Sequence, residues 1–155
     1  MKTFQTAYET LAGHGERVLG FAQLPLNSKD FPPGYAYDVD KANFPTKDLV
    51  FVGLMALMDP PRTTVPDAVA KCKQAGIRVI MVTGDHPLTA VAIARQVGII
   101  EGKTVDDLAK MQKIPVEEVN PDDADAVVVK GADIDGLVTE DWDRILAKRQ
   151  IVFAR

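Results

Sequence analysis

Residues 77–87 constrain the fold of this chain more than any other stretch. Of residues 77–82, five are apolar and four of those are β-branched, a pattern typical of a central parallel strand covered on both faces. Thr83, Gly84 and Asp85 follow at the predicted carboxyl end of this strand, and a helix is predicted over about 87–97. In open α/β sheets ligands bind at the carboxyl ends of strands, and a helix N-terminus favours anions. If the chain handles a phosphate, the sequence predicts it at this turn.

Helices and strands are predicted to alternate from residue 62 onward. Helices are expected over about 64–75, 87–97, 104–114 and 139–149, and strands over 77–82, 126–129 and from 151. Thr64, Thr104 and Thr139 are the expected N-caps, and Gly76 and Gly98 are the expected helix stops. This alternation predicts an α/β fold built on a parallel sheet with right-handed crossovers.

The first third of the chain is less regular. A helix is predicted over 4–11, and strands are predicted over 17–24 and 49–57. Between the strands the chain is rich in Pro, Gly, Asp and Asn, which predicts a long irregular excursion. Its expected anchors are four aromatic side chains, Phe31, Tyr35, Tyr37 and Phe44. The run Asp59-Pro60-Pro61-Arg62 then predicts a stiff hinge or domain boundary, because each proline fixes φ and lacks a backbone donor.

Composition narrows the classes of function. The chain has 155 residues and a net charge of −4, and without a block of Lys or Arg a nucleic-acid partner is not expected. Cys72 is its one cysteine, so neither an internal disulfide nor a Cys-based zinc site is possible, and a reducing compartment is inferred. No signal peptide is predicted, and the longest apolar run is about half a bilayer span. The chain is expected to be soluble as it stands, which leaves a membrane-bound parent open.

Thr83-Gly84-Asp85 is the first candidate site, and two interpretations of it stay open. As a phosphate clamp, the hydroxyl and the following amides would donate to phosphoryl oxygens, while Asp85 positions a hydroxyl, a water or a metal. As a structural turn, Asp85 would be the N-cap of the helix that begins near Pro87.

Three arginines are further candidates for binding an anion. Arg62 leaves the stiff hinge, Arg17 begins a strand, and Arg155 follows the apolar end of the last one; each could hold phosphate or carboxylate with its guanidinium. The alternatives are a plain linker for 59–62 and ordinary surface arginines. Other polar and aromatic residues are expected to be structural: His14 and His86 in turns, Asp122, Asp123 and Asp125 in a solvated loop, and Trp142 as a helix-face anchor.

Four segments of the chain occur together, in this order and spacing, in a known family. They are Gly15-Glu16-Arg17-Val18-Leu19-Gly20-Phe21, Asp59-Pro60-Pro61-Arg62, Val79-Ile80-Met81-Val82-Thr83-Gly84-Asp85-His86-Pro87 and Phe153-Ala154-Arg155. Through them the chain resembles P-type cation-transporting ATPases, and along its whole length it is similar to the α-subunits of sodium/potassium and hydrogen/potassium pumps. The resemblance implies a cytoplasmic piece with three parts: 1–58 from the end of the nucleotide-binding domain, 59–62 as hinge, and 63–155 from the phosphorylation domain. An incomplete haloacid-dehalogenase-like, Rossmann-type parallel sheet is then expected in the last part.

The resemblance also implies a role for each matching residue. Arg17 is similar to an arginine that contacts ATP phosphates, and Asp59 and Arg62 match a hinge motif that holds nucleotide between two domains. Thr83 matches the hydroxyl that holds the transferred phosphoryl group, Gly84 lines it, and Asp85 contacts the ribose side of the nucleotide. Arg155 matches an arginine at the nucleotide cleft.

Two motifs of the family have no match in this sequence. The phosphorylated aspartate lies in Asp-Lys-Thr-Gly-Thr, whereas the one Asp-Lys here, Asp40-Lys41, is followed by Ala-Asn. The magnesium motif Gly-Asp-Gly-x-Asn-Asp is also missing, so no metal ligands are predicted in the chain and those for Mg are expected outside it. The chain alone is therefore expected to be inactive, and its parent to be an integral membrane pump with this region on the cytoplasmic side.

The implied function is a share in binding Mg-ATP and in forming an aspartyl-phosphate that drives cation transport. ATP or ADP and the rest of the pump α-subunit, including its membrane domain, are the expected partners. Exposed strand edges are also expected, with possible self-association. Two alternatives stay open: a catalytically dead nucleotide-sensing module that keeps Arg17 and the cleft, and an interaction or scaffold fragment.

Overall fold

The computed structural model describes residues 2–155, with side chains from residue 3 onward. These residues form two compact units. One is Val18–Ala56, and the other combines the residues up to Arg17 with Leu57–Arg155. The predicted division at 59–62 concerns the family's domains and stays a prediction.

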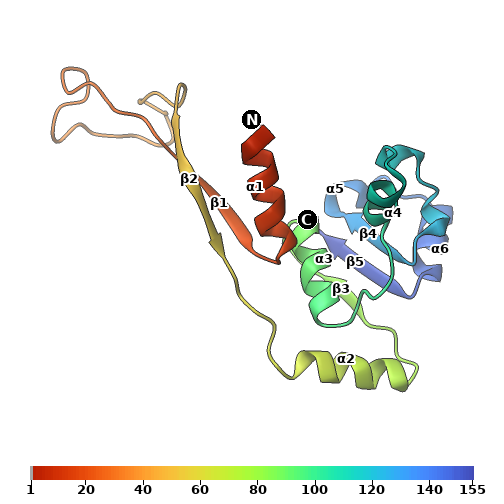
Figure 1. Cartoon of the computed structure of the whole chain (residues 1–155). Helices are drawn as coiled ribbons and strands as arrows, with labels where there is room; N and C mark the ends of the chain where they lie inside the picture. Colours follow the sequence, from red (N-terminus) through yellow and green to blue (C-terminus); the bar gives the residue numbers. More distant parts are fainter. Residues whose placement is uncertain (1) are drawn as a thin grey trace. The chain divides into compact units, whose positions relative to one another are not determined.

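The larger unit is built on three parallel strands (Figure 1). They are β3 (Ile80–Val82), β4 (Ala126–Lys130) and β5 (Gln150–Ala154), in the order β3-β5-β4. Its α-helices are α1 (Lys2–Gly13), α2 (Val65–Gln74), α3 (Pro87–Gln96), α4 (Val105–Gln112), α5 (Gly131–Ile134) and α6 (Thr139–Ala147), with short 3₁₀ turns η1 (Val116–Glu118) and η2 (Pro121–Asp123). The predicted α/β fold with a parallel sheet is therefore confirmed.

Side chains of the central strand β5 alternate between two apolar layers. Val152 and Ala154 belong to a cluster with residues of α2 and α3, whereas Ile151 and Phe153 belong to one with Ile145 of α6. Because successive side chains of a strand point to opposite faces, this division places helices on both sides of the sheet. Ile151 and Val152 are fully buried, so β5 is the centre of the core.

The two connections between the parallel strands have the same hand. The chain passes from β3 to β4 through α3, and it returns from β4 to β5, in the opposite direction, through α5 and α6. Helices of the outward and return paths pack on opposite faces of the sheet. Reversing both the direction and the face keeps the hand of the crossover, as parallel folds require.

The prediction that residues 77–82 form a central strand is wrong. The strand starts only at Ile80, pairs with β5 alone, and lies at the edge of the sheet. Val82 is 78% exposed and Ile77 is 57% exposed. A β-branched apolar run reports a preference for extended backbone, whereas a central position depends on which strands pair, and that is decided far along the chain.

The predicted helix signals had mixed outcomes. Thr104 is confirmed as N-cap of α4, where its hydroxyl accepts from the N–H of Asp107 and the Asp107 carboxylate accepts from the N–H of Thr104. Gly76 and Gly98 are confirmed as stops with φ of +74° and +76°. Thr64 occupies the predicted N-cap position of α2, but among residues 2–155 its side chain makes no capping hydrogen bond. Thr139 is wrong as N-cap, because α6 already includes it and Val138, whose side chain has no acceptor, holds the N-cap position.

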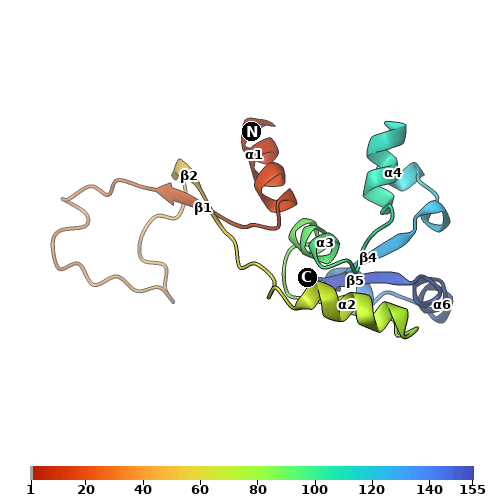
Figure 2. The ribbon, with the colours of Figure 1, turned by 60° about the horizontal axis from the view of Figure 1, so that its bottom comes forward.

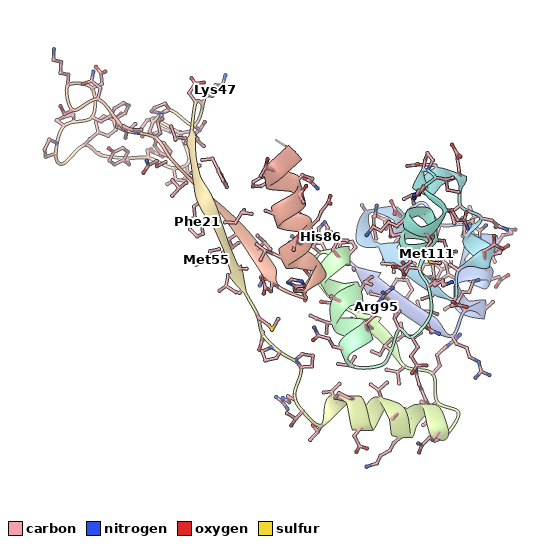
Figure 3. The ribbon with its side chains drawn as sticks, in the orientation of Figure 1. Phe21, Lys47, Met55, His86, Arg95 and Met111 are labelled. Atoms are coloured by element: carbon pink, nitrogen blue, oxygen red, sulfur yellow. The ribbon has the colours of Figure 1, made fainter. Side chains whose placement is uncertain are left out.

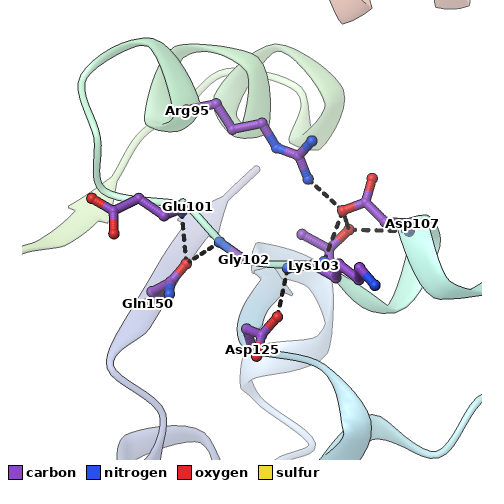
Figure 4. Close-up of polar contacts among 8 residues, drawn as sticks. Arg95, Glu101, Gly102, Lys103, Asp107, Asp125 and Gln150 are labelled. Atoms are coloured by element: carbon purple, nitrogen blue, oxygen red, sulfur yellow. Dashed lines mark hydrogen bonds and ion pairs between the residues drawn. The ribbon is translucent and has the colours of Figure 1, made fainter.

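Residues 101–125 form a small layer of their own beside the sheet. Helix α4 stands away from the strands in Figure 2 and packs its buried Leu108 and Ala109 against Val119 and Ala124. Polar contacts tie this layer to the rest of the larger unit, as Figure 4 shows: Arg95 of α3 pairs with Asp107, and the Gln150 side chain accepts from the N–H groups of residues 101 and 102.

The unit Val18–Ala56 has very little buried surface. Strands β1 (Arg17–Gln23) and β2 (Val50–Leu57) form a two-stranded sheet, and Figure 3 labels Phe21 and Met55, whose exposures are 45% and 56%. Between the strands lies the predicted irregular excursion. Its aromatic anchors are confirmed by ring contacts that link Phe31, Tyr35, Tyr37 and Phe44.

Candidate functional site

The turn after β3 holds two of the candidate side chains against each other. The Thr83 hydroxyl donates to the Asp85 carboxylate at 3.0 Å, and the Asp85 N–H donates back to the Thr83 hydroxyl oxygen at 3.1 Å. Both residues are half-buried, and Gly84 between them is exposed. The hydroxyl is therefore held in place at the carboxyl end of a parallel strand, beside the start of α3.

Arg155 is brought to the same turn by strand pairing. The Thr83 N–H donates to the Phe153 carbonyl at 2.9 Å, and the Arg155 N–H donates to the Asp85 carbonyl at 3.1 Å. The pairing of β3 with β5 is thus continued past Val82, and the exposed Arg155 lies next to Asp85 through its backbone. The structure therefore brings Thr83, Asp85 and Arg155 together at the carboxyl ends of β3 and β5.

Lys130 and Gly131 lie at this edge as well, and the sequence analysis did not single them out. Lys130 ends β4 opposite Ala154, and a Cβ built at Gly131 would lie 3.6 Å from the Arg155 Cα. The sequence could have identified Lys130, because the carboxyl end of the predicted strand over 126–129 had to lie beside the carboxyl ends of the other parallel strands. Lys130 adds an exposed ammonium to the guanidinium of Arg155.

His86 caps helix α3, so the alternative with Asp85 as N-cap is wrong. The Nδ1 atom of His86 accepts from the Leu88 N–H at 3.3 Å. The His86 ring also makes an edge-to-face contact with Tyr8 of α1, with ring centroids 5.7 Å apart. Asp85 is left with Thr83 as its side-chain partner, one residue outside the cap.

Residues near α1 make further contacts with α3. The Thr89 hydroxyl donates to the Glu16 carbonyl at 3.2 Å, and the Gln96 side chain donates to the His14 carbonyl at 3.4 Å. One carboxylate oxygen of Glu16 is buried and has no hydrogen-bond partner among the residues that the structure describes. The segment that precedes Arg17 is therefore docked on the helix that follows the candidate turn.

Arg17, Asp59 and Arg62 are not joined to that turn. All three are exposed, Arg17 at the start of β1 and the other two in the irregular segment between β2 and α2. None of the hydrogen bonds or ion pairs found within residues 2–155 connects them to Thr83, Asp85 or Arg155. Their predicted roles in binding nucleotide stay predictions.

Other predicted structural residues take simple positions. Trp142 contacts Phe153, with ring centroids 6.0 Å apart, which confirms it as an anchor of α6. Asp125 accepts from the Lys103 N–H at 2.9 Å. Within residues 2–155, no group of three or more His, Cys, Asp or Glu side chains gathers as metal ligands would. No helix of that range has the length and apolar character needed to cross a bilayer.

The chemistry of this edge suits an anion. The ends of three strands carry a hydroxyl, a guanidinium and an ammonium. The one carboxylate among them, that of Asp85, accepts the hydrogen bond of the Thr83 hydroxyl. A phosphoryl oxygen competes with that carboxylate for the same donor, because both are acceptors.

Comparison with known proteins assigns the chain to a group of relatives. Residues 1–64 match the family model described as P-type ATPase, cytoplasmic domain N. The chain is 58% identical over 155 residues to potassium-transporting ATPase alpha chain 2 of Cavia porcellus and 59% identical over 155 residues to sodium/potassium-transporting ATPase subunit alpha-2 of Bos taurus. It is also 59% identical over 157 residues to the sodium/potassium-transporting ATPase alpha subunit of Tetronarce californica. These alignments cover 98–99% of the chain and 15% of each relative.

Proposed function

Because the chain belongs to the family of P-type cation-transporting ATPases, we propose that it holds part of the ATP and the transferred phosphoryl group in an ATP-driven cation pump. The relatives are named as potassium-transporting and sodium/potassium-transporting ATPases. The chain spans 15% of their length, so the pump's remaining parts would supply the phosphorylated aspartate, the membrane domain and the ion path.

The observation that carries the proposal is the meeting of Thr83, Asp85 and Arg155 at one edge of the parallel sheet. Open α/β sheets bind their ligands at this edge. Phosphoryl transfer depends on positioning and charge stabilisation rather than on new covalent chemistry by the protein. A fixed hydroxyl, with an exposed arginine whose backbone contacts the same turn, would provide both.

Thr83 and Asp85 would exchange partners when nucleotide binds. In the structure, the hydroxyl of Thr83 donates to the Asp85 carboxylate. A phosphoryl oxygen would accept this hydrogen bond instead, and charge repulsion would turn the carboxylate of Asp85 away, toward a hydroxyl on the ribose side of the nucleotide. A Cβ added at Gly84 would meet nothing within 4 Å, so the open space beside this glycine would leave the phosphoryl group room to approach the backbone.

The exposed arginines would hold the rest of the nucleotide. The guanidinium groups of Arg17, Arg62 and Arg155 can each bind phosphate oxygens with two parallel hydrogen bonds. Asp59 would accept from Arg62 or from the nucleotide in the hinge. Binding by exposed arginines is screened by salt, so nucleotide affinity is expected to fall as ionic strength rises.

Magnesium would enter with the nucleotide. The carboxylates of residues 2–155 do not gather into a metal-binding group, so the Mg²⁺ ligands are expected in other parts of the pump. When bound, the ion would neutralise phosphate charge. The roles proposed for Thr83, Asp85 and the arginines are all direct contacts with the nucleotide.

The rest of the pump is also the proposed partner of two exposed apolar surfaces. The edge strand β3 has one unpaired side and an exposed Val82, so a further strand would complete a haloacid-dehalogenase-like sheet. Strands β1 and β2 expose apolar side chains along their length, and two-stranded sheets are marginal without added strands or a helix. Further strands of a nucleotide-binding domain would cover them.

A titration with ATP and with ADP, each with and without magnesium, tests this function. Amide NMR should show shifts at Arg17, at residues 59–62 and 83–85, and at Arg155, with weak affinity. A Thr83→Ala variant should lose the shifts at 83–85, and the exposed Thr63→Ala should keep them. If no amide shifts at millimolar nucleotide, the proposed binding by this chain is refuted, and its exposed apolar surfaces would favour an interaction module instead.

A further inference from the structure

A cavity lies at the opposite end of the parallel sheet from Thr83 and Arg155. It has a volume of about 460 Å³ and is lined by residues 76–79, which lead into β3, and by Arg149 and Gln150, where β5 begins. Cavities of this size hold small molecules. Thr83 and Arg155 lie at the carboxyl ends of the same strands, so the cavity is separate from the proposed nucleotide site and does not depend on it.

Positive charge dominates the lining of this cavity. Three cationic side chains, Lys73, Arg78 and Arg149, face one acidic side chain, that of Glu101. Lys73 pairs with Glu101 at 2.8 Å. Arg78 donates to the carbonyls of Leu146 and Lys148 at the end of α6, which fixes its guanidinium there without a carboxylate partner among residues 2–155.

Two donors in the lining have no acceptor among residues 2–155. The Arg149 guanidinium has no hydrogen-bond or ion-pair partner there. Gln150 uses its side-chain oxygen to accept from the N–H groups of Glu101 and Gly102, at 2.8 and 2.9 Å, which fixes the side chain and leaves its NH₂ group unpaired. An arginine fork and an oriented amide thus face a cavity with excess positive charge.

We propose that this cavity binds the phosphate group of a small phosphorylated molecule. The Arg149 fork can hold two phosphate oxygens, and the Gln150 NH₂ can donate to a further one. Lys73 and Arg78 add charge that favours a dianion over a single carboxylate. Ile77, Val79 and Ala147 provide an apolar wall for the organic part of the ligand.

Inorganic phosphate and glycerol phosphate, titrated into the 155-residue chain at constant ionic strength, test the proposal by amide NMR. Shifts are expected at residues 76–79, 101 and 149–150 and at the Gln150 side-chain NH₂. Vesicles that contain phosphatidic acid form a second arm: broadening of the same signals only with vesicles assigns the phosphate to a lipid headgroup, and shifts with the soluble compounds assign it to a small molecule. If neither affects these signals, the proposal is overturned.

Two substitutions with opposite expected effects on phosphate affinity make the test specific. Arg149→Gln should weaken binding about tenfold, because it removes a charged fork, and Glu101→Gln should tighten it roughly threefold by removing the one acidic side chain of the lining. Lys110→Gln on α4 changes the net charge as Arg149→Gln does but lies outside the cavity, so it should have no effect. Equal affinity in all three variants would show only nonspecific attraction and would refute the site.

Discussion

The two sheets of this chain illustrate opposite ways of using apolar residues. In the three-stranded sheet, Ile151 and Val152 have no exposed surface, and helices cover both faces. In the two-stranded sheet, Val50, Val52 and Met55 are each more than half exposed. Most residues in the strands of both sheets are apolar, so apolar composition alone does not decide burial.

The two sheets differ in burial because helices cover the three-stranded sheet and none covers the two-stranded one within its own unit. Parallel strands need crossover helices, and those helices supply the cover. The strands β1 and β2 are joined by an irregular excursion that brings no helix of its own. The three-stranded unit therefore contains the buried core and the candidate site, and other parts of the pump are the proposed cover of the two-stranded unit.

The largest expected effect concerns the site of the three-stranded unit. In a full-length pump that contains this region, Thr83→Ala should lower the rate of phosphoryl transfer by about 10²–10³, by analogy with the loss of one preorganised donor at an oxyanion. Phosphoenzyme formation measures it, with Thr63→Ala as the control. If a Thr83→Ala pump turns over near the parent rate, Thr83 does not contribute to phosphoryl transfer.

The second prediction tests burial directly with one substitution in each sheet. Val152→Ala should lower the free energy of unfolding by about 2 kcal/mol, because two methyl groups leave a close-packed core. Val52→Ala, at a position 61% exposed, should change it by less than about 0.5 kcal/mol. Trp142, the one tryptophan, packs on Phe153 of β5, so its fluorescence reports unfolding of the unit that contains the three-stranded sheet. Equal losses would show that the two-stranded sheet is part of the same core.

Much of the fold could be predicted from local sequence. Helix stops at Gly76 and Gly98, the capping box at Thr104 and the aromatic anchors of the excursion depend on residues near one another in the chain. The central position of β5 could not be predicted this way, because it follows from pairing between strands about 70 residues apart. Local pattern identified the strand over residues 80–82 but not its place at the edge.

The position of the candidate residues was predictable to the same extent. The rule that ligands bind at the carboxyl ends of parallel strands placed Thr83, Asp85 and Arg155 at such ends, and the structure brings the three together there. The same rule would have found Lys130, had it been applied to the end of β4. That His86 rather than Asp85 caps α3 could not be predicted, since Thr83 competes for the Asp85 carboxylate, and such competition depends on the turn's exact backbone.

A third prediction concerns the layer that extends the three-stranded unit. Burial raises the pKa of Asp107, but hydrogen bonds from Thr104 and the charge of Arg95 outweigh it and hold that pKa below its ordinary value of 3.8. A lowered carboxyl pKa stabilises the fold above the ordinary value, and this stabilisation is lost as pH falls through the folded-state value. Asp107→Asn should therefore cost about 1 kcal/mol at neutral pH, with a smaller cost at acid pH.

Thermal unfolding measures this effect when it is followed from neutral pH down to pH values below 3.8, the ordinary pKa of the carboxyl group. Asp106→Asn is the matched control, because Asp106 is an exposed first-turn residue of α4. A cost for Asp107→Asn that does not change with pH would mean that packing, rather than the charge of Asp107, fixes α4 beside α3.

The smallest expected effect lies in the two-stranded unit. The Tyr35 hydroxyl donates to the Asn43 carbonyl at 3.0 Å and so ties the two sides of the excursion together. Tyr35→Phe keeps the ring contacts with Phe31 and Tyr37 but removes this hydrogen bond. Unfolding followed by Trp142 should change by less than about 0.5 kcal/mol, whereas amide exchange over residues 36–44 should become faster. A matching loss in the Trp142 transition would show that the excursion stabilises the parallel sheet, and the contrast between the two units would then be one of degree.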